Sequence, residues 1–140
     1  MKILALDLGD RWIGTAISDS SLIVARPYKT VELNNLISFL TELFTKERIS
    51  TVIVGKPQTF RGTESEQTKK IIAQKEKLEV LFPVCSWIFW EERLTSKHAK
   101  MMSSPKQKEE LHSVAAALIL DSYLTYLRFK KELESESDDE

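Results

Sequence analysis

Residues 1–19, MKILALDLGDRWIGTAISD, decide the fold of this chain. The alternating apolar run ILAL ends on Asp7, and a second apolar run, IGTAI, follows a short polar stretch. Gly9 and Gly14 bracket the reversal between the two runs, so we expect a β-hairpin whose first strand carries a carboxylate to the sheet surface. A carboxylate fixed on a strand is costly unless a positive partner meets it, and a divalent cation is a common partner. The alternative is a solvated aspartate in a turn.

The composition is that of an ordinary globular protein. The chain has 140 residues, of which 42% are apolar and 29% are charged, and this length suits one domain with a real core. The first residues run straight into a strand, without the charged and apolar segments of a secretion signal, and no apolar run reaches the length of a membrane span. The single cysteine, Cys85, excludes a disulfide within the chain. We therefore expect a cytoplasmic protein with no membrane partner.

The net charge of −1 hides an uneven distribution. The last nine residues, ELESESDDE, hold six acids and no base, which leaves residues 1–131 at +5. We expect residues 1–131 to form a single domain and residues 132–140 to form an acidic, disordered tail. A mildly basic domain permits nucleic-acid binding, although a charge of this size is also ordinary for a solvated surface.

Strand and helix patterns alternate along the rest of the chain. Pro27 lies within a predicted strand and lacks an N–H, so this strand is expected at a sheet edge. Strands are expected at residues 23–31, 51–54 and 84–90, and helices at residues 36–44, 63–78, 95–102 and 106–133. This order predicts an α/β fold, with a five-stranded mixed sheet of three antiparallel and two parallel strands flanked by helices.

Acidic residues stand at the carboxyl ends of two predicted strands. Asp7 ends the first strand, and Glu91 and Glu92 end the strand at residues 84–90. Functional groups gather at the carboxyl ends of strands in open α/β sheets, so we expect these acids to converge. Neighbouring strand residues face opposite sides, and we favour Glu92 as the partner of Asp7. Carboxylate oxygens hold Mg²⁺, and a pair of such ions can clamp the attacking and leaving oxygens of a phosphodiester.

Five motifs occur along the chain: LALDLGDRWIGTAISD, VGKP, RGTE before a helix, WEERLTS and SVAAALILDSYL. In order and spacing they resemble the RuvX (YqgF) family, and the resemblance extends to about residue 127. That family consists of small bacterial RNase H-like proteins described as Holliday junction resolvases and as nucleases that mature the 5′ end of pre-16S rRNA. The resemblance implies an RNase H-like fold and an acidic site that holds Mg²⁺ or Mn²⁺.

The resemblance also implies roles for individual residues. Asp7 matches the family's first-strand aspartate, Glu92 matches the glutamate of its Asp-Glu-Arg-Leu-Thr motif, and Glu91 stands where the family has aspartate. Ahead of SVAAA the family has a third aspartate, and this chain has His112. A neutral imidazole removes one negative charge and suits Mn²⁺ better than Mg²⁺. Glu109, three residues earlier on the same helix face, is the candidate to restore the carboxylate.

The predicted catalytic residues are therefore Asp7, Glu92 and His112, and the predicted metal ligands are Asp7, Glu92 and Glu109. The alternative is that Glu109 and His112 are ordinary residues of a helix start, which leaves a site of two acids. Related RuvC-type sites use a histidine near the start of this helix, where it activates water.

Positive side chains near these acids are candidates to bind backbone phosphates. Each of them is also typical of a solvated surface. Arg93, which adjoins the acids, is the strongest candidate for phosphate binding. The predicted nucleic-acid-binding residues are Arg11, Lys56, Arg61 and Arg93. Trp12, at the tip of the predicted hairpin, is a candidate to stack on an unpaired base.

These features favour a cytoplasmic, metal-dependent nuclease that acts on structured RNA, the precursor of 16S rRNA, in ribosome biogenesis, as a monomer or weak homodimer. A DNA four-way junction is the alternative substrate, and its cleavage in two strands needs a symmetric dimer. A non-catalytic RNA-binding ribosome-assembly factor is the alternative that the lost aspartate favours. Sugar-kinase and actin-type ATPases share the Asp-x-Gly hairpin, but they need two such domains around the nucleotide.

Overall fold

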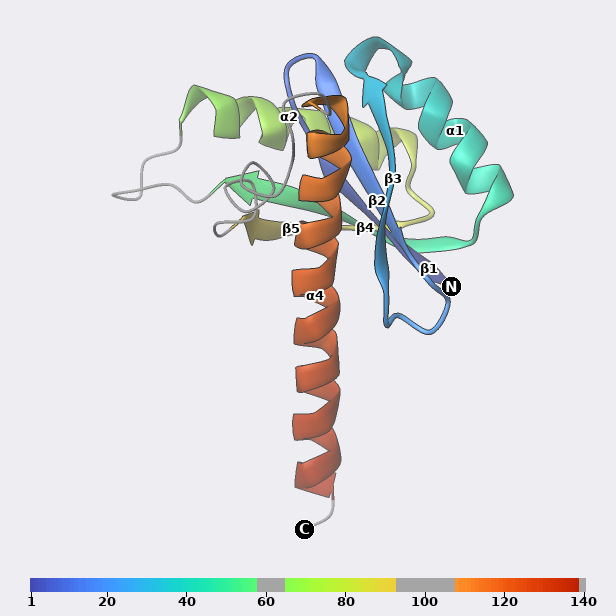
Figure 1. Ribbon diagram of the computed structural model, residues 1–140, viewed down its shortest axis with the longest axis vertical. Coiled ribbons are helices and arrows are strands. Elements are labelled where there is room, and N and C mark those ends of the chain that lie inside the picture. Colours follow the sequence, from blue (N-terminus) through green and yellow to red (C-terminus); the bar gives the residue numbers. More distant parts are fainter. Residues whose placement is uncertain (58–64, 93–107, 139–140) are drawn as a thin grey trace.

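The computed structural model (Figure 1) describes residues 1–57, 65–92 and 108–138, without the side chains of Pro57, Glu92, Lys108, Glu109, Ser137 and Asp138. Its strands are β1 (Lys2–Asp7), β2 (Trp12–Ser18), β3 (Ala25–Glu32), β4 (Ile49–Pro57) and β5 (Ser86–Glu92). Its α-helices are α1 (Leu36–Lys46), α2 (Glu66–Leu81) and α4 (Lys108–Asp138), and a single 3-10 turn, Leu33–Asn35, precedes α1. The predicted helix at residues 95–102 lies outside the described residues.

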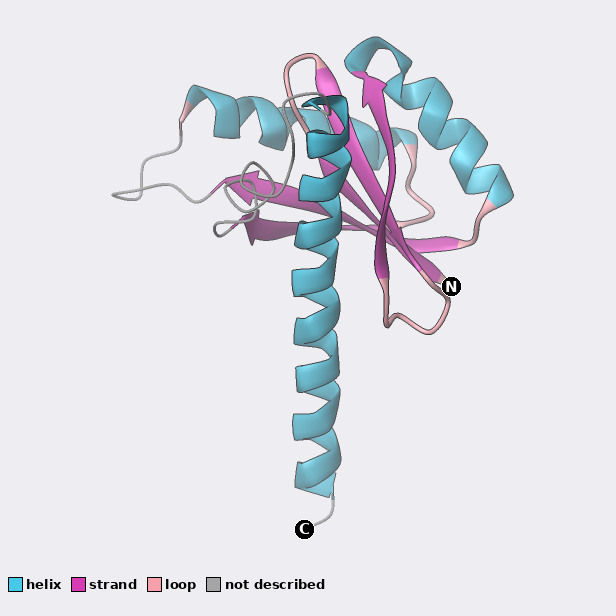
Figure 2. Cartoon of the chain, in the orientation of Figure 1, coloured by secondary structure: helices cyan, strands magenta, loops and turns pink. Residues whose placement is uncertain are grey.

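The five strands form one sheet in the order β3-β2-β1-β4-β5 (Figure 2). The β1–β2 and β2–β3 pairs are antiparallel, and the β1–β4 and β4–β5 pairs are parallel. The predicted α/β fold with a mixed five-stranded sheet is therefore confirmed. β3, which carries Pro27, lies at the predicted edge, and β4 lies between two neighbours, where both of its faces are covered.

Side-chain alternation along β1 divides the core into two layers. Leu4 and Leu6 pack with α1 and α2 on one face of the sheet, and Ile3 and Ala5 pack with α4 on the other face. Figure 1 shows α4 crossing the face opposite to α1 and α2. The layer under α4 consists of small and branched side chains and one aromatic ring: Ile3, Ala5, Ala16, Ile53, Ala116, Ala117, Ile119, Leu120, Tyr123 and Leu124.

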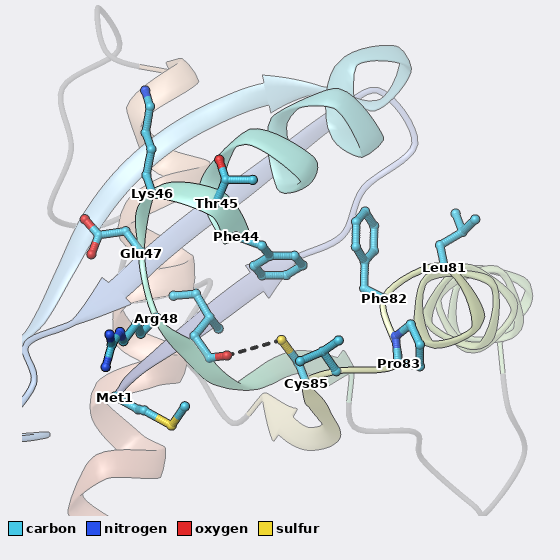
Figure 3. Close-up of a pocket in the computed structure, with 12 residues that line it drawn as sticks. Met1, Phe44, Thr45, Lys46, Glu47, Arg48, Leu81, Phe82, Pro83 and Cys85 are labelled. Carbon is cyan, nitrogen blue, oxygen red and sulfur yellow. Dashed lines mark hydrogen bonds between the residues drawn. The ribbon is translucent and has the colours of Figure 1, made fainter.

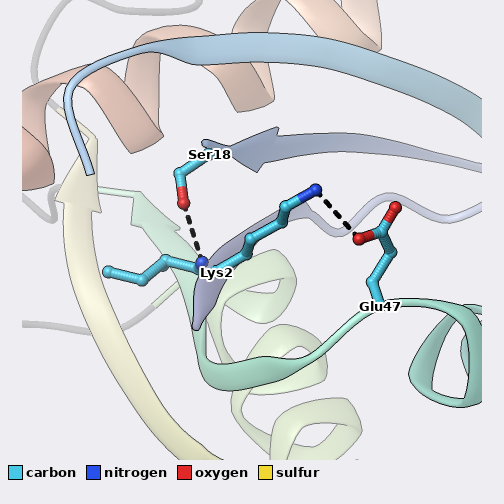
Figure 4. A network of polar contacts seen from close by, with 4 residues as sticks. Lys2, Ser18 and Glu47 are labelled. Carbon is cyan, nitrogen blue, oxygen red and sulfur yellow. Dashed lines mark hydrogen bonds and ion pairs between the residues drawn. The ribbon is translucent and has the colours of Figure 1, made fainter. Parts of the chain in front are cut away.

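Polar contacts fix the start of the sheet (Figure 4). The buried hydroxyl of Ser18 accepts a hydrogen bond of 2.8 Å from the main-chain N–H of Ile3, which ties the end of β2 to β1. The ammonium of Lys2 lies 2.9 Å from the carboxylate of Glu47, in the connection between α1 and β4. These contacts tie the amino end of β1 to β2 and to the connection that leads into β4.

Two elements are longer than the sequence predicts. β4 continues to Pro57, and α4 continues to Asp138, whereas the sequence predicts a strand end at residue 54, a helix end at residue 133 and a disordered tail over residues 132–140. β5 provides the hydrogen-bonding partner that extends β4, since Lys56 pairs with Glu91. The glutamates of the tail are good helix formers, so the helix continues past the sheet with exposed side chains. The extent of the single domain, residues 1–131, stays a prediction.

None of the helices in the described ranges combines the length with the apolar character that crossing a membrane requires.

Candidate active site

Asp7 is the last residue of β1, at the carboxyl edge of the parallel part of the sheet. Side chains alternate between the two faces along a strand, so Asp7 lies on the same face as Ile3 and Ala5. This is the face that α4 covers. The residue is half-buried, and it pairs with Gly14 in the antiparallel β1–β2 ladder. The predicted hairpin is therefore present, and the structure shows that its acid lies on the face that α4 covers.

The first turns of α4 rest directly on Gly14. A Cβ at this position would lie 1.8 Å from the carbonyl oxygen of His112 and 2.9 Å from the main-chain nitrogen of Ser113. No side chain fits there, so glycine is required for α4 to approach the sheet this closely. The contact brings the main chain of His112 next to the strand position that pairs with Asp7, although the two residues are far apart in the sequence.

The side chain of His112 is half-buried at this junction. Burial lowers the pKa of its imidazole, because removal from water disfavours the charged form. The imidazole is therefore neutral at neutral pH and keeps one ring nitrogen as an acceptor or ligand. The buried hydroxyl of Ser113 donates a hydrogen bond of 3.0 Å to the carbonyl of Glu110, which steadies the first turns of the helix.

The register of β4 and β5 places position 92 on the same face as Asp7. Leu6 pairs with Val54 and Pro57 pairs with Glu92, so position 92 lies two strands away from Asp7 and about two residues further along. Strand spacing and rise give a separation of about 12 Å between the two Cα atoms. Gly55 lies on the intervening strand and carries no side chain.

Several predicted site residues fall outside the described part of the chain. Arg61 and Arg93 lie in undescribed segments, and the side chains of Glu92 and Glu109 are not described. Among the side chains that the structure does describe, no three His, Cys, Asp or Glu residues gather as a metal-binding group. The predicted ligand set of Asp7, Glu92 and Glu109 therefore stays a prediction. Its chemistry, hard carboxylate oxygens beside a neutral imidazole, fits Mg²⁺ or Mn²⁺.

Arg11 and Lys56 occupy different surroundings. Arg11 lies exposed at the tip of the β1–β2 hairpin, at the same edge as Asp7, with its guanidinium carbon 5.3 Å from the ring centre of Trp12. The Lys56 ammonium lies 5.7 Å from the ring centre of Phe89, a residue of the core layer under α1 and α2. The structure therefore brings Arg11 to the edge that carries Asp7 and turns Lys56 toward the opposite face.

Two features of this edge do not follow from the sequence motifs. The first is the role of Gly14 as the seat of α4, because the sequence indicates only a turn glycine. The second is Lys70 of α2, whose ammonium lies 3.8 Å from the carboxylate of Asp10 at the hairpin tip. From the sequence alone, a lysine on the polar face of a predicted helix that pairs with a distant acid cannot be distinguished from one that is simply exposed to solvent.

A separate hollow of about 590 Å³ lies at the other end of the parallel strands (Figure 3). It is bounded by the amino end of β4 and the carboxyl ends of α1 and α2, with Met1, Phe44, Phe82 and Cys85 in its lining. The Cys85 thiol donates a hydrogen bond of 3.3 Å to the carbonyl of Ile49, and burial raises the pKa of this thiol. The apolar lining and the distance from the carboxyl edge separate this hollow from the Asp7 site.

Known proteins are similar to this chain in sequence. A family model described as "RuvX: Holliday junction resolvase" matches residues 1–126. A protein of Caldanaerobacter subterraneus subsp. tengcongensis is 38% identical over 136 residues, covering 89% of this chain and 96% of its own. A protein of Rubrobacter xylanophilus is 34% identical over 130 residues, covering 88% of this chain and 91% of its own. Both carry the name "Putative pre-16S rRNA nuclease".

Solved structures share the fold. Thermus thermophilus RuvC in complex with a Holliday junction substrate superposes with a TM-score of 0.60 at 16% identity, over 93% of this chain and 96% of that one. A second T. thermophilus RuvC structure gives a TM-score of 0.53 at 12% identity, over 85% of this chain and 92% of that one. At these identities the likeness concerns the fold alone, and it confirms the RNase H-like expectation. With the family model matched over residues 1–126, the chain belongs to the RuvX family.

Proposed function

We propose that this protein is a divalent-metal-dependent nuclease that hydrolyses phosphodiester bonds of structured RNA, and that its substrate is the precursor of 16S rRNA during ribosome biogenesis. The observation that carries the proposal is the junction at which the carbonyl of His112 rests on Gly14, beside Asp7. It brings the main chain of His112, whose imidazole is neutral, beside the strand position that pairs with the acid. The names of the two relatives support the choice of RNA as substrate.

Asp7, Glu92 and Glu109 are the residues that would hold Mg²⁺ or Mn²⁺. The bound metal would supply positive charge to the phosphate oxygens and a lowered pKa to a bound water. His112, kept neutral by burial, is suited to accept a proton from the attacking water. Asp7 is thus assigned to metal binding and His112 to proton transfer.

The proposed substrate contacts come from the positive residues around this edge. Arg11 at the hairpin tip would bind backbone phosphates together with Arg61 and Arg93, which would give affinity without reading the base sequence. Lys56 would contribute less, because its ammonium lies toward the opposite face. Since the substrate is a ribosomal precursor, the proposed location is the cytoplasm.

Cleavage of a pre-16S RNA fragment that spans the mature 5′ end tests this function. Mg²⁺ and Mn²⁺ are titrated separately against the wild-type protein, Asp7→Asn and Asp10→Asn. Asp10 is the matched control, since it lies on the same hairpin but is exposed at the tip, 3.8 Å from Lys70. We expect metal-dependent cleavage by the wild type and Asp10→Asn, and a loss of roughly a hundredfold or more in Asp7→Asn.

RNA binding by the wild type without cleavage under any metal condition would overturn the nuclease proposal in favour of a non-catalytic assembly factor. The description of the matched family model favours a second candidate, cleavage of a DNA four-way junction. A synthetic junction assayed beside the RNA separates the two candidates. If the junction is cleaved faster than the RNA, the DNA junction replaces RNA as the proposed substrate.

A further inference from the structure

The distal half of α4 projects past the sheet and carries an unpartnered apolar face. Figure 1 shows the helix continuing well beyond the strands. Tyr126, Phe129 and Leu133 are 42%, 59% and 50% exposed, respectively. Their spacing of three and four residues places them on one side of the helix, and we name these three residues the distal stripe. Large side chains arranged in this way are typical of a contact surface.

The distal stripe continues from an ordered aromatic cluster on β5 and α4. The ring centres of Trp90 and Tyr126 are 5.1 Å apart, and Trp90 also packs edge-on against Tyr123 at 5.1 Å. The indole N–H of Trp90 donates a hydrogen bond of 3.1 Å to the hydroxyl of Ser122. The stripe therefore begins at side chains that the fold already holds in place, which lowers the entropy cost of docking.

Charges on the distal half of α4 are separated by sign. The positive residues Arg128, Lys130 and Lys131 are followed by acids at every second position to the helix end, and the last turn has no base. Acids at a helix carboxyl end meet the negative end of the helix dipole, so this end is electrostatically unfavourable by itself. A partner that covers this face should present positive charge to the acids and negative charge to the basic residues.

We infer that the partner is a second copy of this chain, docked antiparallel along the distal stripe. When Phe129 is placed opposite Leu133 of the second copy, Leu133 meets Phe129 in return, as a two-fold interface requires. The stripes then pack against each other at two equivalent places. Parallel pairing would instead bring the basic residues of both helices together and the acids of both helices together.

The flanking charges fit this same register. At 100° per residue, Arg128 and Glu132 lie on one flank of the stripe, and Lys130 and Glu134 lie on the other. In the antiparallel pair, the flank that carries Arg128 meets the flank that carries Glu132 of the other chain, and Lys130 meets Glu134 in the same way, each pair about two residues, or ~3 Å, from level. The long side chains span this offset, so the apolar contacts and both sets of charges are compatible with one alignment.

This interface leaves both candidate active sites open. The two-fold axis passes near residue 131, and the helix rise puts the two His112 positions about 57 Å apart. The dimer therefore stands independently of the proposed nuclease chemistry. Two short helix segments form a small interface, so the dimer is weak and depends on concentration and salt.

Sedimentation velocity of the full chain over a wide concentration range tests the inference. The wild type is expected to shift from monomer to dimer, and Phe129→Ser/Leu133→Ser to weaken the dimer by roughly tenfold or more. Val80→Ser is the matched control, since Val80 is an exposed apolar residue on α2, away from the stripe. Circular dichroism verifies that the variants keep the helix.

Charge reversal tests the register. Arg128→Glu/Lys130→Glu and Glu132→Lys/Glu134→Lys are each expected to lose self-association, and an equimolar mixture of the two is expected to recover it, because every flank pair is then restored. A wild type that stays monomeric throughout, or a mixture that does not associate, would overturn the inference. The measured quantity is mass rather than cleavage, so this outcome and the outcome for the nuclease proposal are independent.

Discussion

The main-chain carbonyl of His112 lies against Gly14, where a Cβ would stand 1.8 Å from its oxygen. Gly14 in turn pairs with Asp7 in the β1–β2 ladder. A position without a side chain thus determines how closely α4 approaches the candidate acid. The contact joins the hairpin that opens the chain to the helix that ends it.

Gly14→Ala is expected to push α4 away from β2. The added methyl meets main-chain atoms that cannot rotate aside, so we expect a loss of about 3 kcal/mol in the free energy of unfolding. Cleavage should fall further than the remaining folded fraction explains. Denaturant unfolding and RNA cleavage of the same preparation provide the two measurements.

Gly9→Ala is the control for that variant. A Cβ at Gly9 would lie 2.6 Å from the carbonyl oxygen of Trp12, so the change strains the hairpin turn without touching α4. We expect reduced stability with cleavage per folded molecule retained. Equal losses of cleavage in the two variants would argue against a specific role for the contact between Gly14 and His112.

The stability of the protein should depend on pH through His112. Burial lowers the pKa of this imidazole in the folded state, so the unfolded chain binds a proton more readily than the folded chain. The stabilising contribution is complete above the ordinary histidine pKa of about 6.5 and is lost as pH falls through the lowered value. The His112→Gln variant should therefore lose less stability than the wild type between neutral and mildly acidic pH. Thermal unfolding of both proteins at several pH values measures this difference. Identical profiles would contradict this prediction.

His112→Asp should change the metal preference of cleavage. The substitution adds a carboxylate at the junction with Gly14, and hard oxygen ligands favour Mg²⁺ more than an imidazole does. We expect the ratio of cleavage rates in Mg²⁺ and Mn²⁺ to rise by roughly tenfold. His112→Asn, which is neutral and similar in size to aspartate, is the control and should leave the ratio low. An unchanged ratio in both variants would show that a carboxylate at position 112 does not reach the metal.

Arg11→Ala and Lys56→Ala should differ in their effect on RNA binding. Arg11 lies exposed at the edge that carries Asp7, whereas the Lys56 ammonium packs 5.7 Å from the ring centre of Phe89 on the opposite face. Removing one phosphate contact should weaken binding to all sequences and reduce the salt dependence of the affinity by about one ion. Fluorescence anisotropy at several salt concentrations should show this effect for Arg11→Ala and little change for Lys56→Ala. The reverse order would place the RNA on the other face.

Local sequence signals are sufficient for most of the fold. Alternation in ILAL, the paired glycines and the missing N–H of Pro27 each depend on nearby residues, and the hairpin and the edge strand follow from them. The extension of β4 does not follow from local sequence. Hydrogen bonds from β5 continue the strand through Gly55 and Lys56, where the sequence alone predicts a loop. The face of Lys56 is set by that continuation.

The candidate site likewise contains residues that local sequence predicts and residues that it does not. Asp7 is predictable because a strand ends on it, and its face follows from alternation. The position of His112 next to the strand pair of Asp7 and Gly14 is not predictable in this way. It arises because the main chain of α4 contacts a glycine on a strand far away in the sequence, and no local pattern encodes that contact. The ligand roles of Glu92 and Glu109 depend on side chains outside the described residues and stay predictions.

The position of β5 at the sheet edge has a consequence for solubility. Its sequence SWIFW is uncharged and rich in aromatic and branched residues, which is the composition of an aggregation-prone segment. Within the described part of the chain, one side of this strand has no neighbour in the sheet. Glu91 and Glu92 end this run and serve as its charged gatekeepers. Neutralising Glu92 should therefore lower the soluble yield as well as any cleavage. Asp7→Asn avoids this complication, because β1 is paired on both sides.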